Sequence, residues 1–442
     1  MSVGNLKDYG NKGNNFPYQL RSLQLLSAID GSINTLIDDG ISFQGTAVDS
    51  FGRLRVSEPF TLFDSSNRYE DNGLWATRIV GTTGAATFNA NQGLIDLTID
   101  LLPGDSVTRE TYKVFAYQPG KSLLILNTFV FNTPQQDLIQ RVGYYNNDNG
   151  YFLDQSGSTV SFVERSYISG TPTDTYINQS AWNYDKLDGS GPSGFILKLD
   201  NAQILWIDME WLGVGSVRMG FVIDGKFILC HTFQHANIIP STYITTACLP
   251  LRYEIRSASS DGSTVTLKQI CSSVISEGGY ELRGKPGSVT VPILTPRNLT
   301  VAGTYYPIAS LRLKATKLDA IVIPKGVSVL PASVSNYSFV VITGGTTVGG
   351  SWVDAGSDSA VEYNITGTSV TGGSNSLHGF FTQTNQSSSS INITGGDLFR
   401  YQLDRNPLTS TPREFTLAVA ASTIGGGGVN IYGAIDWEEI SR

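Results

Sequence analysis

The chain has 442 residues, of which 40% are hydrophobic and only 15% are charged, and its formal net charge at pH 7 is −8. Lysines and arginines are scattered and form no basic stripe, which excludes a nucleic-acid-binding surface. The many Gly (47), Tyr (20) and Phe (20) residues are typical of an all-β chain with many turns, not of a helical or disordered one. No apolar run reaches the roughly 18 residues of a membrane span, so we expect no membrane insertion.

Cysteine usage and the N-terminus indicate where the chain is made. The cysteines Cys230, Cys248 and Cys271 show no CxxC spacing, and a small, odd number of them predicts no disulfide framework. The first residues, MSVGNLKDYGNKGNN, lack the apolar segment of a secretory signal. We therefore expect assembly in a reducing cytoplasm.

The chain is expected to begin with an arm and one short α-helix. Residues 1–15 are rich in Gly and Asn and predict irregular structure. Residues 16–40 suit a helix, because Pro17 fits a first turn and Asp38-Asp39-Gly40 fits an end. Four apolar residues spaced by 3, 4 and 3 positions form a short a/d seam in this helix: Leu26, Ile29, Ile33 and Leu36.

Two interpretations of this seam stay open. In the first, the apolar stripe packs against the sheet of its own chain. In the second, it is a self-association seam, because a lone helix ahead of a β body has no helical partner in its own chain. The second interpretation assigns residues 1–42 to anchoring or oligomerisation.

From about residue 43 the apolar period changes from 3.6 to 2, which indicates strands. The clearest hairpin is VRMGFVIDGKFILCHTF, residues 217–233, with Asp224-Gly225 as a two-residue type I′ loop. Cys230 is expected in the core of this hairpin and not as a nucleophile. The predicted register pairs Val222 with Phe227, Gly220 with Leu229 and Arg218 with His231 on one face, and Ile223 with Lys226, Phe221 with Ile228 and Met219 with Cys230 on the other.

A second β domain is expected after residue 285. Pro and Gly concentrate over 283–298, which suits a domain boundary, and strand alternation resumes beyond it. The residues predicted to face its core are Phe415, Leu417, Val419 and Ala421 in one strand and Val429, Ile431, Ile435 and Trp437 in another. The expected fold is thus all-β: an arm and one short α-helix (1–42), a β-sandwich body (43–285) and a C-terminal jelly-roll-like domain (286–442).

The stretch QILWIDMEW, residues 203–211, is the strongest candidate for catalysis. By the two-residue period, Asp208 and Glu210 share one strand face with Trp206, while Leu205, Ile207, Met209 and Trp211 form an apolar face. Laminarinase-like β-sandwich glycosidases carry a similar motif, Glu-x-Asp-x-Glu, in which the first Glu is the nucleophile. Here Trp206 stands at that first position, so we interpret the two acids as an outward strand face or a subunit contact.

Other candidate sites are weaker. His231 and His235 are four residues apart, which would serve a metal on a helix but not on a strand, and no third ligand is near in sequence. The run GGGG at 425–428 lacks the Lys-Ser/Thr ending of a phosphate loop. Tyr144 and Tyr145 are candidate surface aromatics for sugar stacking. We expect no catalytic residue, no metal and no cofactor.

Two segments carry a resemblance to a known family. VDSFGRLRVSEPFTLFDSSNRYEDN (48–72) and the region from WNYDKLDGSGPSG to LWIDMEWLGVGSVRMGFVIDGKFILCHTFQHAN (182–237) resemble virion structural proteins of tailed bacteriophages, especially marine and cyanobacterial ones. The N-terminal GNKGNNFPYQLRSLQLL is similar too. The resemblance implies a structural particle component without established catalytic residues, and it leaves open where in the particle the protein sits.

The expected function is a non-enzymatic structural component of a tailed-phage virion, associated with the tail as a fibre, baseplate or adhesin subunit. Such proteins are commonly trimers, so we expect a homotrimer that contacts other virion proteins, with a host-surface glycan as a further candidate partner. The alternatives are a capsid decoration or head-fibre protein, a carbohydrate-binding host-adsorption module, and a β-sandwich glycosidase centred on Asp208 and Glu210.

Overall fold

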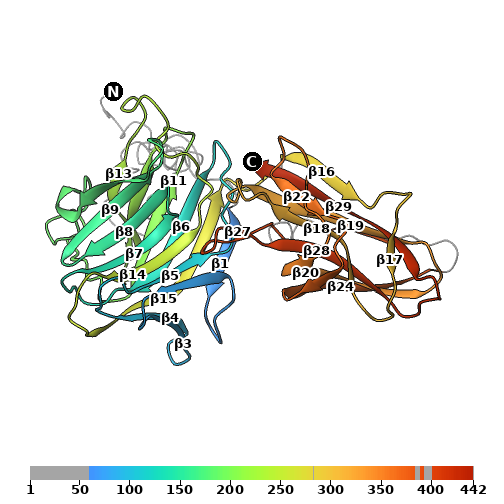
Figure 1. Ribbon diagram of the computed structural model, residues 1–442. Helices are drawn as coiled ribbons and strands as arrows, with labels where there is room; N and C mark the ends of the chain where they lie inside the picture. The colour runs from blue at the N-terminus through green and yellow to red at the C-terminus, as the bar shows by residue number, and fades with distance from the viewer. Residues whose placement is uncertain (1–58, 282, 384–388, 393–400, 442) are drawn as a thin grey trace, which may run out of the picture.

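A computed structural model describes residues 59–281, 283–383, 389–392 and 401–441. These residues are almost entirely strands and turns, and they build two β-sandwiches that lie side by side (Figure 1). The all-β expectation is therefore confirmed. No helix in the described part of the chain is long and apolar enough to cross a membrane. The predicted arm, helix and seam, with Leu26, Ile29, Ile33 and Leu36, lie outside the described residues.

The body sandwich consists of two antiparallel sheets. The first has eight strands in the order β13-β12-β11-β6-β15-β4-β3, with β1 also paired to β15. These strands are β1 (Phe60–Ser66), β3 (Ala85–Asn89), β4 (Leu94–Asp100), β6 (Ser122–Val130), β11 (Gln203–Met209), β12 (Val217–Ile223), β13 (Lys226–Phe233) and β15 (Thr264–Glu277).

The second sheet of the body has seven strands in the order β10-β9-β8-β7-β14-β5-β2. They are β2 (Trp75–Val80), β5 (Ser106–Thr111), β7 (Leu138–Tyr145), β8 (Gly150–Ser156), β9 (Thr159–Ser166), β10 (Thr173–Asn178) and β14 (Leu251–Ser257). A short 3-10 turn, η2 (Gln179–Ala181), follows β10. β4 and β5 are consecutive in sequence but belong to opposite sheets, so the turn at Pro103-Gly104 crosses from one sheet to the other and does not close a hairpin.

The core of the body lies between these sheets and is rich in aromatic rings. Alternate residues of each strand point inward, so Leu205, Ile207 and Met209 of β11 are buried in this core as the two-residue period predicts. The rings of Trp182 and Phe162 stack with their centroids 4.2 Å apart. Large rings bury much apolar area, which makes this core the main source of the body's stability.

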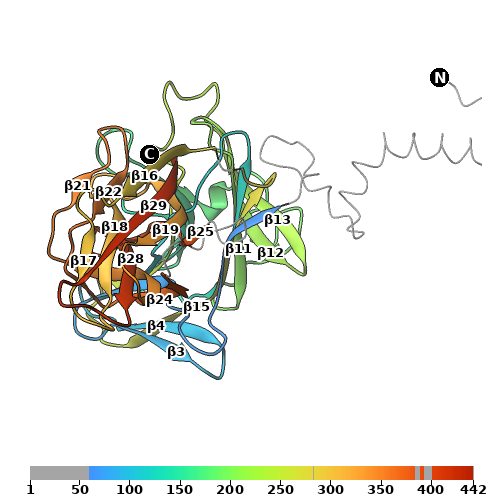
Figure 2. The same cartoon turned by 90° about the vertical axis from the view of Figure 1, so that its right-hand side faces the viewer.

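The C-terminal sandwich also has two antiparallel sheets and lies nearest the viewer in Figure 2. One sheet contains β16 (Lys285–Thr290), β17 (Arg297–Leu299), β19 (Ile321–Pro331), β25 (Ser389–Asn392) and β29 (Val429–Ser441). The other contains β18 (Tyr306–Leu313), β20 (Asn336–Val348), β21 (Val353–Asp354), β22 (Val361–Asn364), β23 (Ser369–Thr371), β24 (Ser374–Thr382) and β28 (Glu414–Ala421). A two-stranded hairpin, β26 (Arg405–Asn406) and β27 (Thr411–Pro412), projects from this sandwich toward the body (Figure 1).

The predicted core positions of the C-terminal sandwich are confirmed. Phe415, Leu417, Val419 and Ala421 of β28 and Val429, Ile431, Ile435 and Trp437 of β29 are all buried. All eight residues of β28 are buried, whereas the prediction placed only alternate residues of this strand in the core. It lies between β18 and β20 in the middle of its sheet, where both faces are covered.

The β12–β13 hairpin matches its prediction for half its length. Asp224 and Gly225 both have positive φ (50° and 73°), as a type I′ turn requires, and the pairs from Ile223/Lys226 to Gly220/Leu229 are as expected. Beyond them a β-bulge shifts the register, so that Met219 pairs with His231 and Arg218 pairs with Thr232. The predicted pairs Met219/Cys230 and Arg218/His231 are therefore wrong, because Cys230 is the extra residue of the bulge. It is nevertheless a core residue, as expected.

The bulge places His231 in a site that favours its neutral form. Its Nδ1 accepts a hydrogen bond from the backbone N–H of Asn183 (3.3 Å), and its ring meets that of Phe233 edge-on at 4.6 Å. Burial lowers the pKa of His231 to about 4, because a charged imidazolium would lose its hydration there.

We predict that His231 makes the fold sensitive to mild acid. Between its unfolded pKa of 6.5 and its folded pKa of about 4, only the unfolded chain takes up a proton at this residue. This contribution to stability is therefore fully present above about pH 6.5 and is lost as the pH falls toward 4. Urea unfolding from about pH 7 to about pH 4.5 should show a smaller loss of unfolding free energy in His231→Gln than in the wild type. Equal losses in the two proteins would contradict the prediction.

Candidate functional site

The two acids of the strand β11 region do not face outward as predicted. Asp208 is 1% exposed and Glu210 is 0% exposed, so the interpretation of an outward strand face is wrong. Asp208 lies opposite Arg218 of β12 in the sheet and forms an ion pair with it, which allows the carboxylate to be buried. The same face also carries Trp206, whose ring lies against Gly220, where no side chain keeps it away. The period of a strand gives the face of a residue, but not whether that face is covered.

Glu210 follows the end of β11, where the chain turns away from the sheet. Its backbone N–H donates to the carbonyl of Ser216 (3.2 Å), which closes the loop back to β12. The Tyr117 ring packs in the same region, and burial, with a contribution from the Glu210 carboxylate, raises the pKa of its hydroxyl to about 12. Asp208 and Glu210 thus lie in packed surroundings and not in an open groove.

The two neighbouring histidines have separate roles. His231 is held by Asn183, whereas Nδ1 of His235 lies 2.6 Å from the Gly215 carbonyl oxygen and Nε2 lies 2.7 Å from a Glu164 carboxylate oxygen. The His235 ring also stacks on Tyr243 at 3.9 Å. Across the described ranges, no group of three or more His, Cys, Asp or Glu side chains gathers to hold a metal.

The aromatic residues suggested for sugar stacking are also placed differently from expectation. Tyr144 and Tyr145 are both fully buried. The Tyr144 hydroxyl donates to the Ala247 carbonyl (2.8 Å) inside the body, and the guanidinium of Arg252 lies 5.1 Å from the centroid of the Tyr145 ring. Neither ring is available to a ligand.

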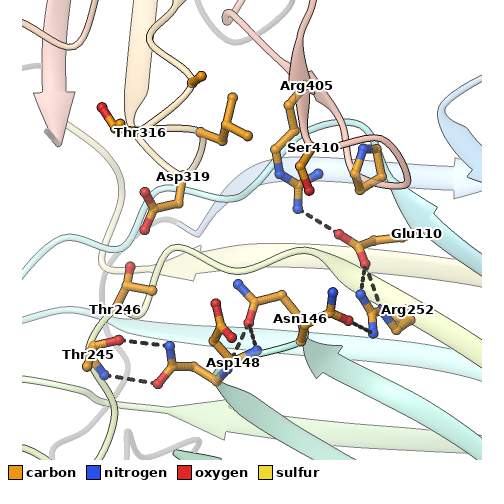
Figure 3. Close-up of a pocket in the computed structure, with 15 residues that line it drawn as sticks. Glu110, Asn146, Asp148, Thr245, Thr246, Arg252, Thr316, Asp319, Arg405 and Ser410 are labelled. Atoms are coloured by element: carbon orange, nitrogen blue, oxygen red, sulfur yellow. Dashed lines mark hydrogen bonds and ion pairs between the residues drawn. The ribbon is translucent and has the colours of Figure 1, made fainter. Parts of the chain in front are cut away.

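A cavity lined by charged and amide side chains lies between the two sandwiches, and we refer to it as the interdomain cleft (Figure 3). Its volume is about 290 Å³. The body contributes the β7–β8 turn (146–149) and the loop at 245–246. The C-terminal sandwich contributes the β18–β19 turn (315–319) and the β26–β27 hairpin (405–410).

A buried triad of charges forms one wall of the cleft. Glu110 of β5 accepts from Nε of Arg252, its partner on β14, at 2.7 Å, and from Nη2 of Arg405 of the C-terminal sandwich at 2.6 Å. The three residues are only 1%, 7% and 7% exposed. Arg405 also donates to the backbone carbonyl of Thr111 (3.2 Å). One carboxylate of the body thus holds a guanidinium from each sandwich.

The Glu110 carboxylate favours the charged form of Arg252. Burial acts to lower the pKa of Arg252, but the adjacent Glu110 carboxylate raises it above the ordinary arginine value. Both oxygens of Glu110 are occupied by the two guanidinium groups (Figure 3). The triad is therefore a satisfied network with one net positive charge, in which removal of Glu110 would leave two buried guanidinium groups uncompensated.

An apolar cluster accompanies the triad at the interface. Val114, Ala116 and Cys248 of the body pack against Ile321 and Ile323 of β19. This cluster buries apolar area between the sandwiches, while the triad fixes how they face one another.

The body side of the cleft is held in place by asparagine side chains. Oδ1 of Asn146 accepts from the backbone N–H groups of Asp148 and Asn149, both at 2.8 Å, as in an Asx turn. Asn149 is buried and bonds to Thr245 twice, through its Oδ1 to the backbone N–H (3.1 Å) and through its Nδ2 to the hydroxyl (2.8 Å). The β7–β8 turn and the 245–246 loop are thereby joined into one rigid edge.

The C-terminal side is fixed in a similar way. The backbone N–H of Lys314 donates to the Ala360 carbonyl and that of Lys317 donates to the Lys314 carbonyl, both at 2.9 Å. Nζ of Lys314 donates to the Gly356 carbonyl (2.8 Å). The turn so formed directs the Asp319 carboxylate toward Thr246 of the body across the opening (Figure 3).

Sequence reasoning missed the cleft. Its residues come from six separate stretches between 110 and 410, and no spacing in the sequence connects them. The one local signal was the stretch NNDNG (146–150), which indicates a turn but not what the turn faces.

No family model matches the sequence, and no curated protein sequence matches it. Among solved structures, the Emp47p carbohydrate recognition domain is 11% identical with a TM-score of 0.33, covering 49% of this chain and 94% of that one. A β-glucanase of Bacillus licheniformis is 14% identical with a TM-score of 0.31, covering 49% and 97%. The botulinum neurotoxin serotype C1 binding domain is 12% identical with a TM-score of 0.30, covering 48% of each chain. TM-scores of this size assign no function to the chain.

We predict that the triad contributes strongly to stability. Arg405→Ala leaves Oε1 of the buried Glu110 carboxylate without its partner, and a buried acceptor left unsatisfied costs about 1–3 kcal/mol, more when the group is charged. The matched control is Arg283→Ala, which removes an ion pair with Glu281 in which the arginine side chain is 80% exposed. Such a surface pair contributes about 0–1 kcal/mol. Denaturant unfolding measures both changes, and an Arg405→Ala loss no larger than that of the control would contradict the prediction.

Proposed function

We propose that the protein is a non-enzymatic structural component of a tailed-phage virion, associated with the tail as a fibre, baseplate or adhesin subunit. The observation that carries the proposal is the interface between the sandwiches, where the triad of Glu110, Arg252 and Arg405 is buried beside an apolar cluster. A subunit that works as a building block needs its domains held in one fixed arrangement, and a buried, satisfied interface provides this.

The segments that carry the resemblance to virion proteins support a scaffold role. Residues 182–237 supply β11, β12 and β13, and with them Trp182, Phe221 and Cys230 of the body core. Residues 60–66 of the other segment form β1, which pairs with β15 in the same sheet. Most of this resemblance therefore falls on residues that pack the body.

The placement of the two acids also supports a non-enzymatic role. A retaining glycosidase needs two carboxyl groups that reach the sugar, with one free to act as nucleophile. Asp208 is engaged by Arg218, and neither Asp208 nor Glu210 is more than 1% exposed. This arrangement fits a structural ion pair better than a catalytic pair.

Labelling of the particle tests the location. Antibodies raised against the full chain, with gold detection by electron microscopy, should bind intact tailed-phage particles at the tail. Labelling over the capsid would instead support the head-fibre or decoration alternative. Absence of the chain from purified particles, measured by mass spectrometry, would refute the virion role altogether.

Assembly through residues 1–42 gives a separate prediction. The seam of Leu26, Ile29, Ile33 and Leu36 is proposed to hold a homotrimer, so a charge placed in it should separate the subunits. Ile33→Asp should shift the full chain from trimer to monomer in size-exclusion chromatography with light scattering. Asn34→Asp, one residue outside the seam, is the matched control and should remain trimeric. An unchanged mass in Ile33→Asp would place the assembly contacts elsewhere.

A further inference from the structure

The cleft between the sandwiches offers both hydrogen-bond acceptors and donors at its opening. Asp148 and Asp319 are exposed acceptors from opposite sides, and neither carboxylate has a hydrogen-bond or ion-pair partner among the described residues. The Thr245 hydroxyl accepts from Asn149 and the Thr246 hydroxyl accepts from the backbone N–H of Cys248 (3.1 Å). Each threonine therefore keeps its own hydrogen for donation outward.

From this pattern we propose that the interdomain cleft binds a short, neutral carbohydrate. Sugar hydroxyl groups both donate and accept, so they can donate to the two aspartates and accept from the two threonines. Leu318 and Pro407 are half-buried in the wall and offer an apolar surface to the C–H groups of a sugar ring. The volume of about 290 Å³ is near the lower end of the range of small-molecule sites, which suits a short oligosaccharide.

The charges of the cleft favour a neutral ligand over an anionic one. The two arginines share the Glu110 carboxylate, and the triad therefore keeps one positive charge, which Asp148 and Asp319 outweigh. A phosphate or sulfate group would meet two unpaired carboxylates at the opening. An amine is the competing class of ligand, because the same two carboxylates would attract it.

The two sides of the cleft are held in place by hydrogen bonds within the protein. Asn146 and Asn149 fix its body side, and the bonds of Lys314 fix its C-terminal side. A preformed site loses little conformational entropy on binding, so a small number of hydrogen bonds can yield measurable affinity. Because both sandwiches contribute, the site exists only while the triad holds them together. This inference goes beyond the proposed structural role and does not depend on it.

The experiment uses the full chain and an array of neutral oligosaccharides (gluco-, manno-, galacto- and rhamno-configured), followed by calorimetric titration of the strongest binder. Asp148→Ala and Asp319→Ala should each weaken binding by about tenfold or more, because each removes a charged hydrogen-bond acceptor. Asp200→Ala removes another exposed aspartate away from the cleft and should leave affinity unchanged. Circular dichroism confirms that each variant is folded.

Two further measurements separate hydroxyl recognition from attraction of a positive charge. Asp319→Asn keeps an acceptor oxygen but removes the charge, so it should retain more affinity for a neutral sugar than Asp319→Ala. Chitosan oligomers and a lysine-rich peptide serve as amine probes, and their preferential binding, weakened by salt, would overturn the proposal in favour of a cationic ligand. No binding by any neutral glycan, or binding unchanged in the two alanine variants, would also overturn it. Neither result alters the outcome of particle labelling, which tests the virion role separately.

Discussion

One carboxylate, that of Glu110, sets the relation between the two halves of this protein. It is almost fully buried and accepts from Arg252 of its own sandwich and from Arg405 of the other. A buried carboxylate without partners would carry a large desolvation cost, and the two guanidinium groups offset this cost, one at each oxygen. Hydrogen bonds are directional, and this requirement therefore fixes how the C-terminal sandwich faces the body.

Apolar and ionic groups make different contributions to the interface. The cluster around Val114, Ile321 and Ile323 removes apolar area from water, which favours contact between the sandwiches. Because the hydrophobic effect is non-directional, this contact alone does not fix the orientation of one sandwich relative to the other. The triad adds the geometric constraint that the apolar contact lacks. The interdomain cleft lies beside this contact, and its shape follows from the same constraint because two of its edges come from each sandwich.

Local patterns predicted local features well, and their failures have clear physical causes. The turn at Asp224-Gly225 was predictable because a two-residue loop requires two residues that tolerate positive φ. The bulge at Cys230 was not, because an extra residue in a strand leaves no mark in a pattern of apolar residues. The two-residue period predicted which face of the strand carries Asp208. It did not predict that this residue is buried, because its burial depends on the ion pair with Arg218 of the neighbouring strand.

The sequence by itself determined the all-β class, many inward-facing positions and the tight turns, because each depends on residues within a few positions of one another. Phe415 and Ile431 faced the core as their spacing predicts. The tertiary structure alone decided the triad and the cleft. Glu110, Asn149, Asp319 and Arg405 are separated by up to 295 positions, and they meet only because sheet pairing and domain docking bring distant segments together. Burial, charge compensation and the shape of a cavity depend on contacts between these distant segments. The spacing of residues within one segment therefore does not predict them.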